Sequence, residues 1–380
     1  MVVGNKSKVI LLLLIQIVQL NFARCEQSCL ESKNTGENIS YRGVTLRTEN
    51  DSFAKTDRNY SHGLVLTFES HDIKNFEPEC FSWPIRLHSK IINFLTPKFL
   101  ISDDNATKMN SLVVKLGQSI YTPKNAARRD LILNDRPYAG VLYIGLSLHQ
   151  RYRPPETNLE MLDASEITLG MIGPSSLAKE FQDNAHDFFG DLRFQGWSHQ
   201  LENEPALQIA IDKKFKTYQG AASQFSGFSV DLIRSIGARL GNIETSANFS
   251  IEGRVGWDIP NDFGSYTIRP GTDSRPPDLT RTQNEVASKN NSSHFGFHFF
   301  TIFDFKYVSY NYSVDGNLFS SSHHVTRQPF VIFSAFGFSF PTILRKRGYN
   351  FAIMQVYQTS DFKEQDAHHA YRSLLLGVDF

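Results

Sequence analysis

Two side chains four residues apart have types that could do acid–base chemistry. The segment 173–190 reads GPSSLAKEFQDNAHDFFG, and its Pro-Ser-Ser start, a dozen helix-forming residues and a final glycine predict a helix near 176–189. On that helix Gln182 and His186 share one face, with the small Ala178 one turn earlier. A neutral imidazole on a rigid helix can activate water as a general base. The opposing interpretation is that His186 is a surface or packing residue.

Oxygen ligands occur in a second segment, 48–63, which reads TENDSFAKTDRNYSHG. Asn50, Asp51 and Ser61 carry the hard oxygen atoms that Ca²⁺ prefers, and a metal held there could stabilise an oxyanion as a Lewis acid. No arrangement of paired cysteines and no HExxH pattern suggests zinc. The alternative is an ordinary turn, since an Asn-Asp pair after a strand is common in turns and no EF-hand spacing is present. No role is predicted for His62.

Three arginines lie in a third segment, 117–143, GQSIYTPKNAARRDLILNDRPYAGVLY. Arg128 and Arg129 are predicted to bind an anionic phosphate headgroup, because guanidinium groups bind phosphate bidentately. For Arg136 a phosphate contact and a structural ion pair with a neighbouring aspartate remain equal alternatives.

The elements that must position these residues alternate apolar and polar residues in segments of about ten, which is typical of transmembrane β-strands. In RSLLLGVDF, which ends the sequence, Leu374, Leu376, Val378 and Phe380 occupy one face. We predict an all-β, twelve-stranded antiparallel transmembrane barrel rather than a secreted β-sandwich. The strands are expected near 41–49, 62–70, 111–118, 139–150, 163–171, 204–217, 226–240, 246–257, 295–309, 326–341, 348–361 and 370–380.

This strand order places the three candidate segments on one side of the membrane. With both chain ends periplasmic, the connections 50–61, 119–138 and 172–203 are all extracellular, and so is the predicted active site. Two long segments, 71–110 and 258–294, then face the periplasm. Within the first, 81–96 is predicted to be a small amphipathic helix that plugs or caps that end, and the second is predicted to be an irregular loop.

Composition and the amino terminus agree with an exported protein of the outer membrane. The 380 residues carry a formal net charge of +0, which gives no reason to expect nucleic-acid binding, because that needs a basic face. Lysines followed by the apolar run VILLLLIQIV predict a cleaved signal peptide over 1–25, and 26–380 is expected to be one barrel domain. Of the three cysteines, Cys29 and Cys80 could form a disulfide in an oxidising compartment.

Taken together, the motifs ENDSF, TDRNYSHG, GQSIYTP, DRPYAGVLY, LGMIGPSSLAKEFQDNAH and GWSHQLENEP, in this order, closely resemble the lipid A 3′-O-deacylase family of Gram-negative outer membranes. The resemblance runs from about residue 41 to the end. It implies a twelve-stranded barrel with its active site between the wall and an extracellular loop helix. It also implies Ca²⁺-dependent hydrolysis of the 3′ acyloxyacyl ester of lipid A, in the manner of secreted phospholipase A₂.

By that resemblance, the water-activating histidine is His186 and its companion is Gln182. The metal and oxyanion region falls on Asn50 and Asp51, with Ser61 beside it. The phosphate-binding residue matches Arg128, or the neighbouring Arg129. The partners expected are lipid A or lipopolysaccharide as substrate and the surrounding outer-membrane lipids, and the protein is expected to be a monomer.

The chain departs from the family pattern after the histidine. Relatives can carry a glutamate six residues later, where this chain has Leu192, and their hydroxyl-bearing aromatic residue is matched by Phe194. These differences concern the details of metal ligation and acyl-chain preference, not the reaction class. Two alternatives to lipid A deacylation are kept separately. One is a phospholipase-type acyl hydrolase that uses the same centre, and the other is a non-catalytic pore or surface-binding barrel.

Overall fold

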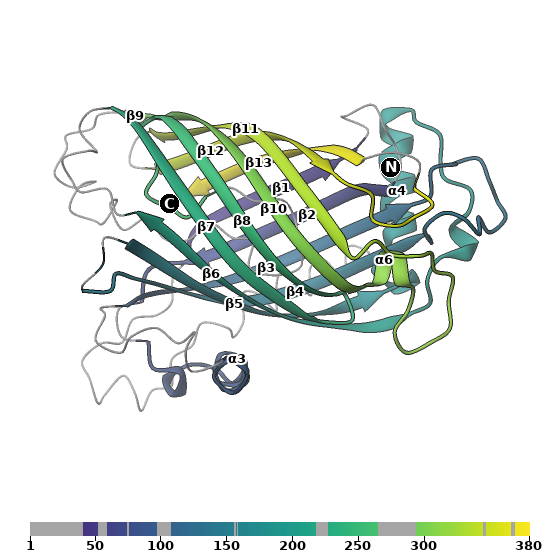
Figure 1. Ribbon diagram of the computed structural model, residues 1–380, viewed down its shortest axis with the longest axis horizontal. Coiled ribbons are helices and arrows are strands. Elements are labelled where there is room, and N and C mark those ends of the chain that lie inside the picture. Colours follow the sequence, from purple (N-terminus) through teal and green to yellow (C-terminus); the bar gives the residue numbers. More distant parts are fainter. Residues whose placement is uncertain are drawn as a thin grey trace.

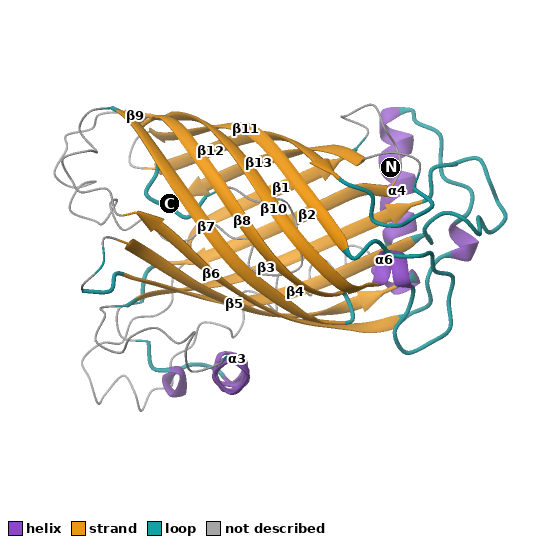
Figure 2. Cartoon of the chain, viewed as in Figure 1, coloured by secondary structure: helices purple, strands orange, loops and turns teal. Residues whose placement is uncertain are grey.

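The chain forms a closed antiparallel β-barrel, seen from the side in the computed structural model (Figure 1). The structure describes residues 41–51, 59–73, 76–96, 108–155, 157, 159–217, 227–264, 294–344, 347–365 and 369–380. Twelve long strands build the wall, as predicted, and Figure 2 shows that strands dominate the structure, with a few short helices at the two ends. They are β1 (Tyr41–Asn50), β2 (Asn59–Ser70), β3 (Met109–Thr122), β4 (Ala139–Tyr152), β5 (Leu159–Ile172), β6 (Glu204–Thr217), β7 (Phe228–Gly241), β8 (Glu244–Trp257), β10 (Phe297–Asn311), β11 (Phe330–Leu344), β12 (Arg347–Gln358) and β13 (His369–Asp379).

Closure comes from pairing the first strand with the last. β1 pairs with both β2 and β13, and β10 pairs with both β8 and β11, so every long strand has two neighbours. A two-residue strand, β9 (His294–Phe295), extends the edge of β11. Because the ladder has no open edge, all its main-chain groups can bond within the wall, which is what a membrane-spanning sheet requires.

The alternation of side chains follows the predicted pattern. Along β7, Leu232, Ile236 and Leu240 are exposed on the outer face, while Asp231 and Arg239 are buried in the interior. The interior charges are paired: Lys115 bonds to Glu166 at 2.7 Å and Lys306 bonds to Glu244 at 3.0 Å. An apolar exterior around a polar, ion-paired interior is the arrangement of an outer-membrane barrel.

Two helices pack on the outside of the barrel at opposite ends. α4 (Ala178–Phe189) lies at the end formed by the connections after β1, β3 and β5, and α3 (Trp83–Leu95) lies at the other end (Figure 1). Short helices accompany them: α6 (Tyr312–Asp315) and the 3₁₀ turns Pro78–Cys80, Pro174–Ser176 and Trp197–His199. None of the described helices is long and apolar enough to cross a membrane. The prediction that 81–96 is helical is confirmed, but its position is not: the helix packs on the outer wall and does not plug the barrel.

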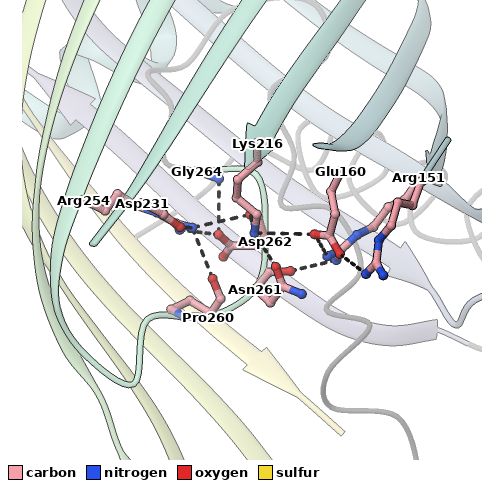
Figure 3. Close-up of polar contacts among 10 residues, drawn as sticks. Arg151, Glu160, Lys216, Asp231, Arg254, Pro260, Asn261, Asp262 and Gly264 are labelled. Carbon is pink, nitrogen blue, oxygen red and sulfur yellow. Dashed lines mark hydrogen bonds and ion pairs between the residues drawn. The ribbon is translucent and has the colours of Figure 1, made fainter. Parts of the chain in front are cut away.

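The described part of the predicted irregular loop 258–294 fills the barrel interior at the α3 end. Figure 3 shows residues 258–264 turned inward, where Arg254 bonds to Asp231 and Asp262. The Phe263 ring is fully buried, with Arg151 and Lys216 each 5.3 Å from its centre. The α3 end of the interior is therefore packed with side chains.

Some predictions fall on residues that the structure does not describe. The signal peptide 1–25 and Cys29 lie outside the described residues, as do 97–107 and 265–293 in the two long segments. Cys80 is disulfide-bonded. All the described strands belong to one sheet.

Candidate active site

The helix α4 is seated on the outer wall of β2, β3 and β4. Its first residue, Ala178, is fully buried beside Gly140 of β4, and a side chain at Gly140 would overlap Ala178 and Ser176. The side chain of Gln118 on β3 donates to the Ser176 carbonyl at 2.6 Å. Ile120, on the same face of β3, joins a buried cluster with Ala178. The space left by Gly140, which has no Cβ, and the apolar contact with Ile120 thus fix where the helix lies.

The local sequence explains how this helix begins and ends. Leu177 precedes it in the left-handed conformation, and Gly190 follows it with a φ of 78°, a conformation that glycine adopts without strain. The predicted stretch near 176–189 is therefore confirmed as a helix over Ala178–Phe189, preceded by the 3₁₀ turn Pro174–Ser176.

The end of β1 is connected to α4 through one histidine. Asn50 pairs with His62 in the β1–β2 ladder, and the Asn50 Nδ2 atom lies 3.5 Å from His62 Nδ1. The His62 ring in turn lies 4.9 Å from the Phe181 ring of α4, measured between centroids. His62 has the same parity in β2 as the outward-facing Leu64, so this chain of contacts runs along the outside of the barrel.

Gln182 is held by an indole. Trp197 Nε1 donates to Gln182 Oε1 at 3.0 Å, and both side chains are buried. The Gln182 Nε2 atom is also buried, with no hydrogen-bond partner among the described residues. Because a buried amide N–H without a partner is costly, this atom is suited to donate to an oxygen of a bound ligand.

His186 has one ring nitrogen fixed by the main chain. Its Nδ1 atom lies 2.7 Å from the Leu192 carbonyl oxygen, and a carbonyl can only accept, so Nδ1 carries the proton. The neutral ring then has Nε2 as its basic atom. Phe194 packs edge-on against the same ring, with 5.7 Å between centroids. The two positions that depart from the family pattern, Leu192 and Phe194, are thus the two that orient the imidazole.

Asp51 and Ser61 lie at the same end of the barrel as Asn50. Asp51 directly follows β1 and is fully buried. Ser61 lies at a bulge in β2, where its hydroxyl is 2.5 Å from that of Thr122 on β3. The Asn50 amide nitrogen faces His62, so its Oδ1 is the atom that would bind a cation.

The donor set at Asn50 and Asp51 suits Ca²⁺ in its chemistry. One amide oxygen and one buried carboxylate are hard oxygen ligands, while six to eight are usual for Ca²⁺. Among the residues that the structure describes, no group of three or more His, Cys, Asp or Glu side chains could hold a metal ion. The remaining oxygens would come from the main chain, water and substrate.

The predicted phosphate-binding arginines are in the connection between β3 and β4. Arg128 and Arg129 are exposed, and Arg128 forms an ion pair with Asp130, which raises the pKa of Arg128. The same connection contacts the segment that follows α4: the Gln195 backbone N–H donates to the Ala126 carbonyl at 2.8 Å. Arg136 has the structural role: it is buried, 2.6 Å from Asp361 and stacked on two aromatic rings.

The sequence did not lead us to predict the contacts of two residues, His62 with α4 and Trp197 with Gln182. His62 was given no role, although a histidine in an otherwise apolar, outward-facing row of β2 is a signal that another part of the protein covers it, here Phe181. Trp197, in the motif GWSHQLENEP, gave no signal that it binds Gln182, because the bond joins two separate parts of one loop.

Comparison with known proteins agrees with this architecture. The solved structure "LpxR from Salmonella typhimurium" matches with a TM-score of 0.64 at 18% identity, covering 89% of this chain and 100% of that one. The β domain of the Bordetella autotransporter Brka matches with a TM-score of 0.43 at 8% identity, over 90% of this chain and 99% of that one. No curated protein matches the sequence. The family model described as "Outer membrane protein LpxR" matches residues 11–380. The chain therefore belongs to the LpxR outer membrane protein family.

Proposed function

We propose that this protein is a lipid A 3′-O-deacylase that hydrolyses the 3′ acyloxyacyl ester of lipid A in a Ca²⁺-dependent reaction. The observation that carries the proposal is the seat of α4 on the outer wall, because a site there faces membrane lipid rather than the barrel interior. The family supports a lipid A deacylase of the outer membrane. The site would face the extracellular leaflet, where lipid A is located.

In the proposed mechanism, His186 activates the attacking water. The Leu192 carbonyl holds the Nδ1 proton, so Nε2 accepts a proton from water as the oxygen attacks the ester carbon. The same nitrogen can then return the proton to the departing hydroxyl. Gln182 Nε2 is positioned to donate a hydrogen bond to a substrate oxygen, while Trp197 fixes the amide through its other end.

Asn50 and Asp51 would hold the metal ion at the other side of the site. A bound Ca²⁺ would supply Lewis-acid stabilisation of the oxyanion. His62 positions Asn50 against the helix, and Ser61 supports the strand at its bulge through Thr122. Arg128 and Arg129 would bind a lipid A phosphate at the exposed edge of the site, where they are accessible to a large headgroup.

The test is expression in a host whose lipid A carries the 3′ acyloxyacyl group, followed by mass spectrometry of lipid A. The wild-type protein should remove that group, and the activity in isolated membranes should be lost on chelation of Ca²⁺ and return when Ca²⁺ is added. His186→Ala should abolish the activity. Asn184→Ala on the exposed side of the same helix is the matched control and should retain it.

Heat-modified gel mobility of each variant reports whether the barrel has folded. Unchanged lipid A with a correctly inserted wild-type barrel across several Ca²⁺ concentrations would overturn the proposal. Release of fatty acid from phospholipid, with lipid A untouched, would instead establish the phospholipase alternative. The pore alternative has less support, because ion pairs and residues 258–264 occupy the described interior.

A further inference from the structure

The helix α3 covers the outer wall at the end of the barrel opposite to α4. Its inner face is anchored by Ile85, which packs with Leu112 of β3 and Leu148 of β4, neighbours in the ladder. His88, on the same inner face, is 2% exposed. Leu112 and Leu148 lie within four residues of the strand ends, so the helix is near the boundary of the membrane-spanning wall.

The outer face of α3 is apolar, and among the residues that the structure describes its large side chains remain exposed. Trp83, Leu87 and Phe94 are 68%, 48% and 87% exposed, and their spacing of four and seven residues places them along one stripe. The exposed Lys90 lies on the same stripe. A water-facing helix would carry polar residues here, so this surface is built for a mostly apolar environment with a polar boundary.

The wall under α3 explains why a helix is needed at this position. Asn110 and Gln150 have the same outward parity as Leu112 and Leu148, and they bond to each other at 3.0 Å. Asn110 also donates to the Ile73 carbonyl in the segment that leads to the helix. The outer face of β3 and β4 is therefore polar near this end and would be a poor surface for lipid.

Elsewhere the same end of the barrel carries aromatic side chains of its own. Phe228 begins β7 and Trp257 ends β8, and their exposed rings pack edge-on with 4.9 Å between centroids. Phe295 and Phe380 are also exposed at this end, at 64% and 60%. Aromatic residues at this position of a transmembrane barrel form a girdle at the lipid headgroups.

We propose that α3 is an interfacial membrane helix that completes this girdle over β3, β4 and β5. The outer face of α3 contacts the phospholipid leaflet at this end of the barrel. Trp83, Leu87 and Phe94 enter the boundary between headgroups and acyl chains, and Lys90 reaches the phosphates. Phe228 and Trp257 lie at the same end of the barrel, on β7 and β8. The membrane contact of α3 is independent of the proposed deacylase activity.

Tryptophan fluorescence in phospholipid nanodiscs tests the proposal, because the chain has three tryptophans in three different environments. The W197F/W257F variant leaves Trp83 alone, and the W83F/W197F variant leaves the girdle residue Trp257 as the matched reference. Phospholipids brominated near the headgroup should quench Trp83 by at least half the fraction measured for Trp257. Iodide in solution should quench Trp83 less than free tryptophan.

A second pair of variants separates membrane contact from simple burial. L87Q/F94Q in the Trp83-only protein should reduce quenching by brominated lipid and increase quenching by iodide, while N93Q, at an exposed polar position of the helix, should change neither. Heat-modified mobility shows that each barrel has folded. Emission from Trp83 that iodide quenches fully and brominated lipid does not quench would overturn the proposal and would leave the stripe for a water-soluble protein partner.

Discussion

Gly140→Ala tests whether the seat of α4 sets the catalytic geometry. The added Cβ would overlap the Cβ of Ala178 and the Oγ of Ser176, both buried at the start of the helix. Carbon atoms in contact are about 3.5–4.0 Å apart, so the helix must move outward by roughly 1 Å or more. A displacement of that size at a catalytic group can cost ~10²-fold in rate. Because Gln182 and His186 are on this helix, we expect about that loss of deacylation in a barrel that still folds.

The control for this substitution is Gly253→Ala in β8. A Cβ there meets its nearest neighbour, a methyl group of Thr301, at 4.0 Å, so the same chemical change causes no displacement. Deacylation is measured as the rate of 3′ acyl release from lipid A by mass spectrometry, and folding by heat-modified mobility. Adding S176A/A178G to Gly140→Ala removes both overlapping atoms and should restore activity. A Gly140→Ala protein with wild-type rate would refute the idea that the wall positions the catalytic helix.

Three further predictions concern the loop, the phosphate contact and α3. Trp197→Phe removes the N–H that binds Gln182 and leaves a buried acceptor unpaired, at a cost of ~1–3 kcal/mol. Hydrogen exchange followed against temperature should therefore show α4 opening at a lower temperature than in the wild type, while the barrel remains intact. Arg128→Ala should raise KM for lipid A by roughly tenfold with little change in kcat, whereas equal losses in both would contradict a role in binding. Burial lowers the pKa of His88 from 6.5 to about 4, because the docked helix holds the imidazole neutral. The docking of α3 is therefore favoured above pH 6.5 and weakens as the pH falls toward 4. Trp83 emission should shift between pH 7.5 and 4.5, and it should stay constant in His88→Gln.

The sequence was sufficient to predict the barrel because each strand carries its own period-two pattern. The prediction 204–217 matches β6 to the residue. By contrast, 111–118 is shorter than β3 (Met109–Thr122), since the ladder continues to Asn110, whose outward side chain is polar and ends the apolar row. The helix over Ala178–Phe189 was also predictable, from local start and stop signals.

The contacts within the site could not be predicted in the same way. The approach of Asn50 to His62 depends on ladder register and on a bulge beside Tyr60, which no local pattern specifies. The guanidinium of Arg136 bonds to Asp361, 225 positions away in sequence, and only its backbone N–H bonds to the neighbouring Asp135. The helical period of 81–96 similarly predicts two faces for α3, but it does not predict which strands the inner face packs against. Side-chain partners across a closed sheet are properties of the fold, not of a window of residues.

The bond from His186 to the main chain at position 192 has an evolutionary consequence. An orienting carboxylate on a side chain disappears with a single substitution, but a peptide carbonyl is present whichever amino acid occupies the position. The proposed general base therefore keeps its tautomer in a chain that has leucine at this position. The side chain of residue 192, which is 83% exposed, is therefore not needed to hold this tautomer, so a substitution there should leave it unchanged.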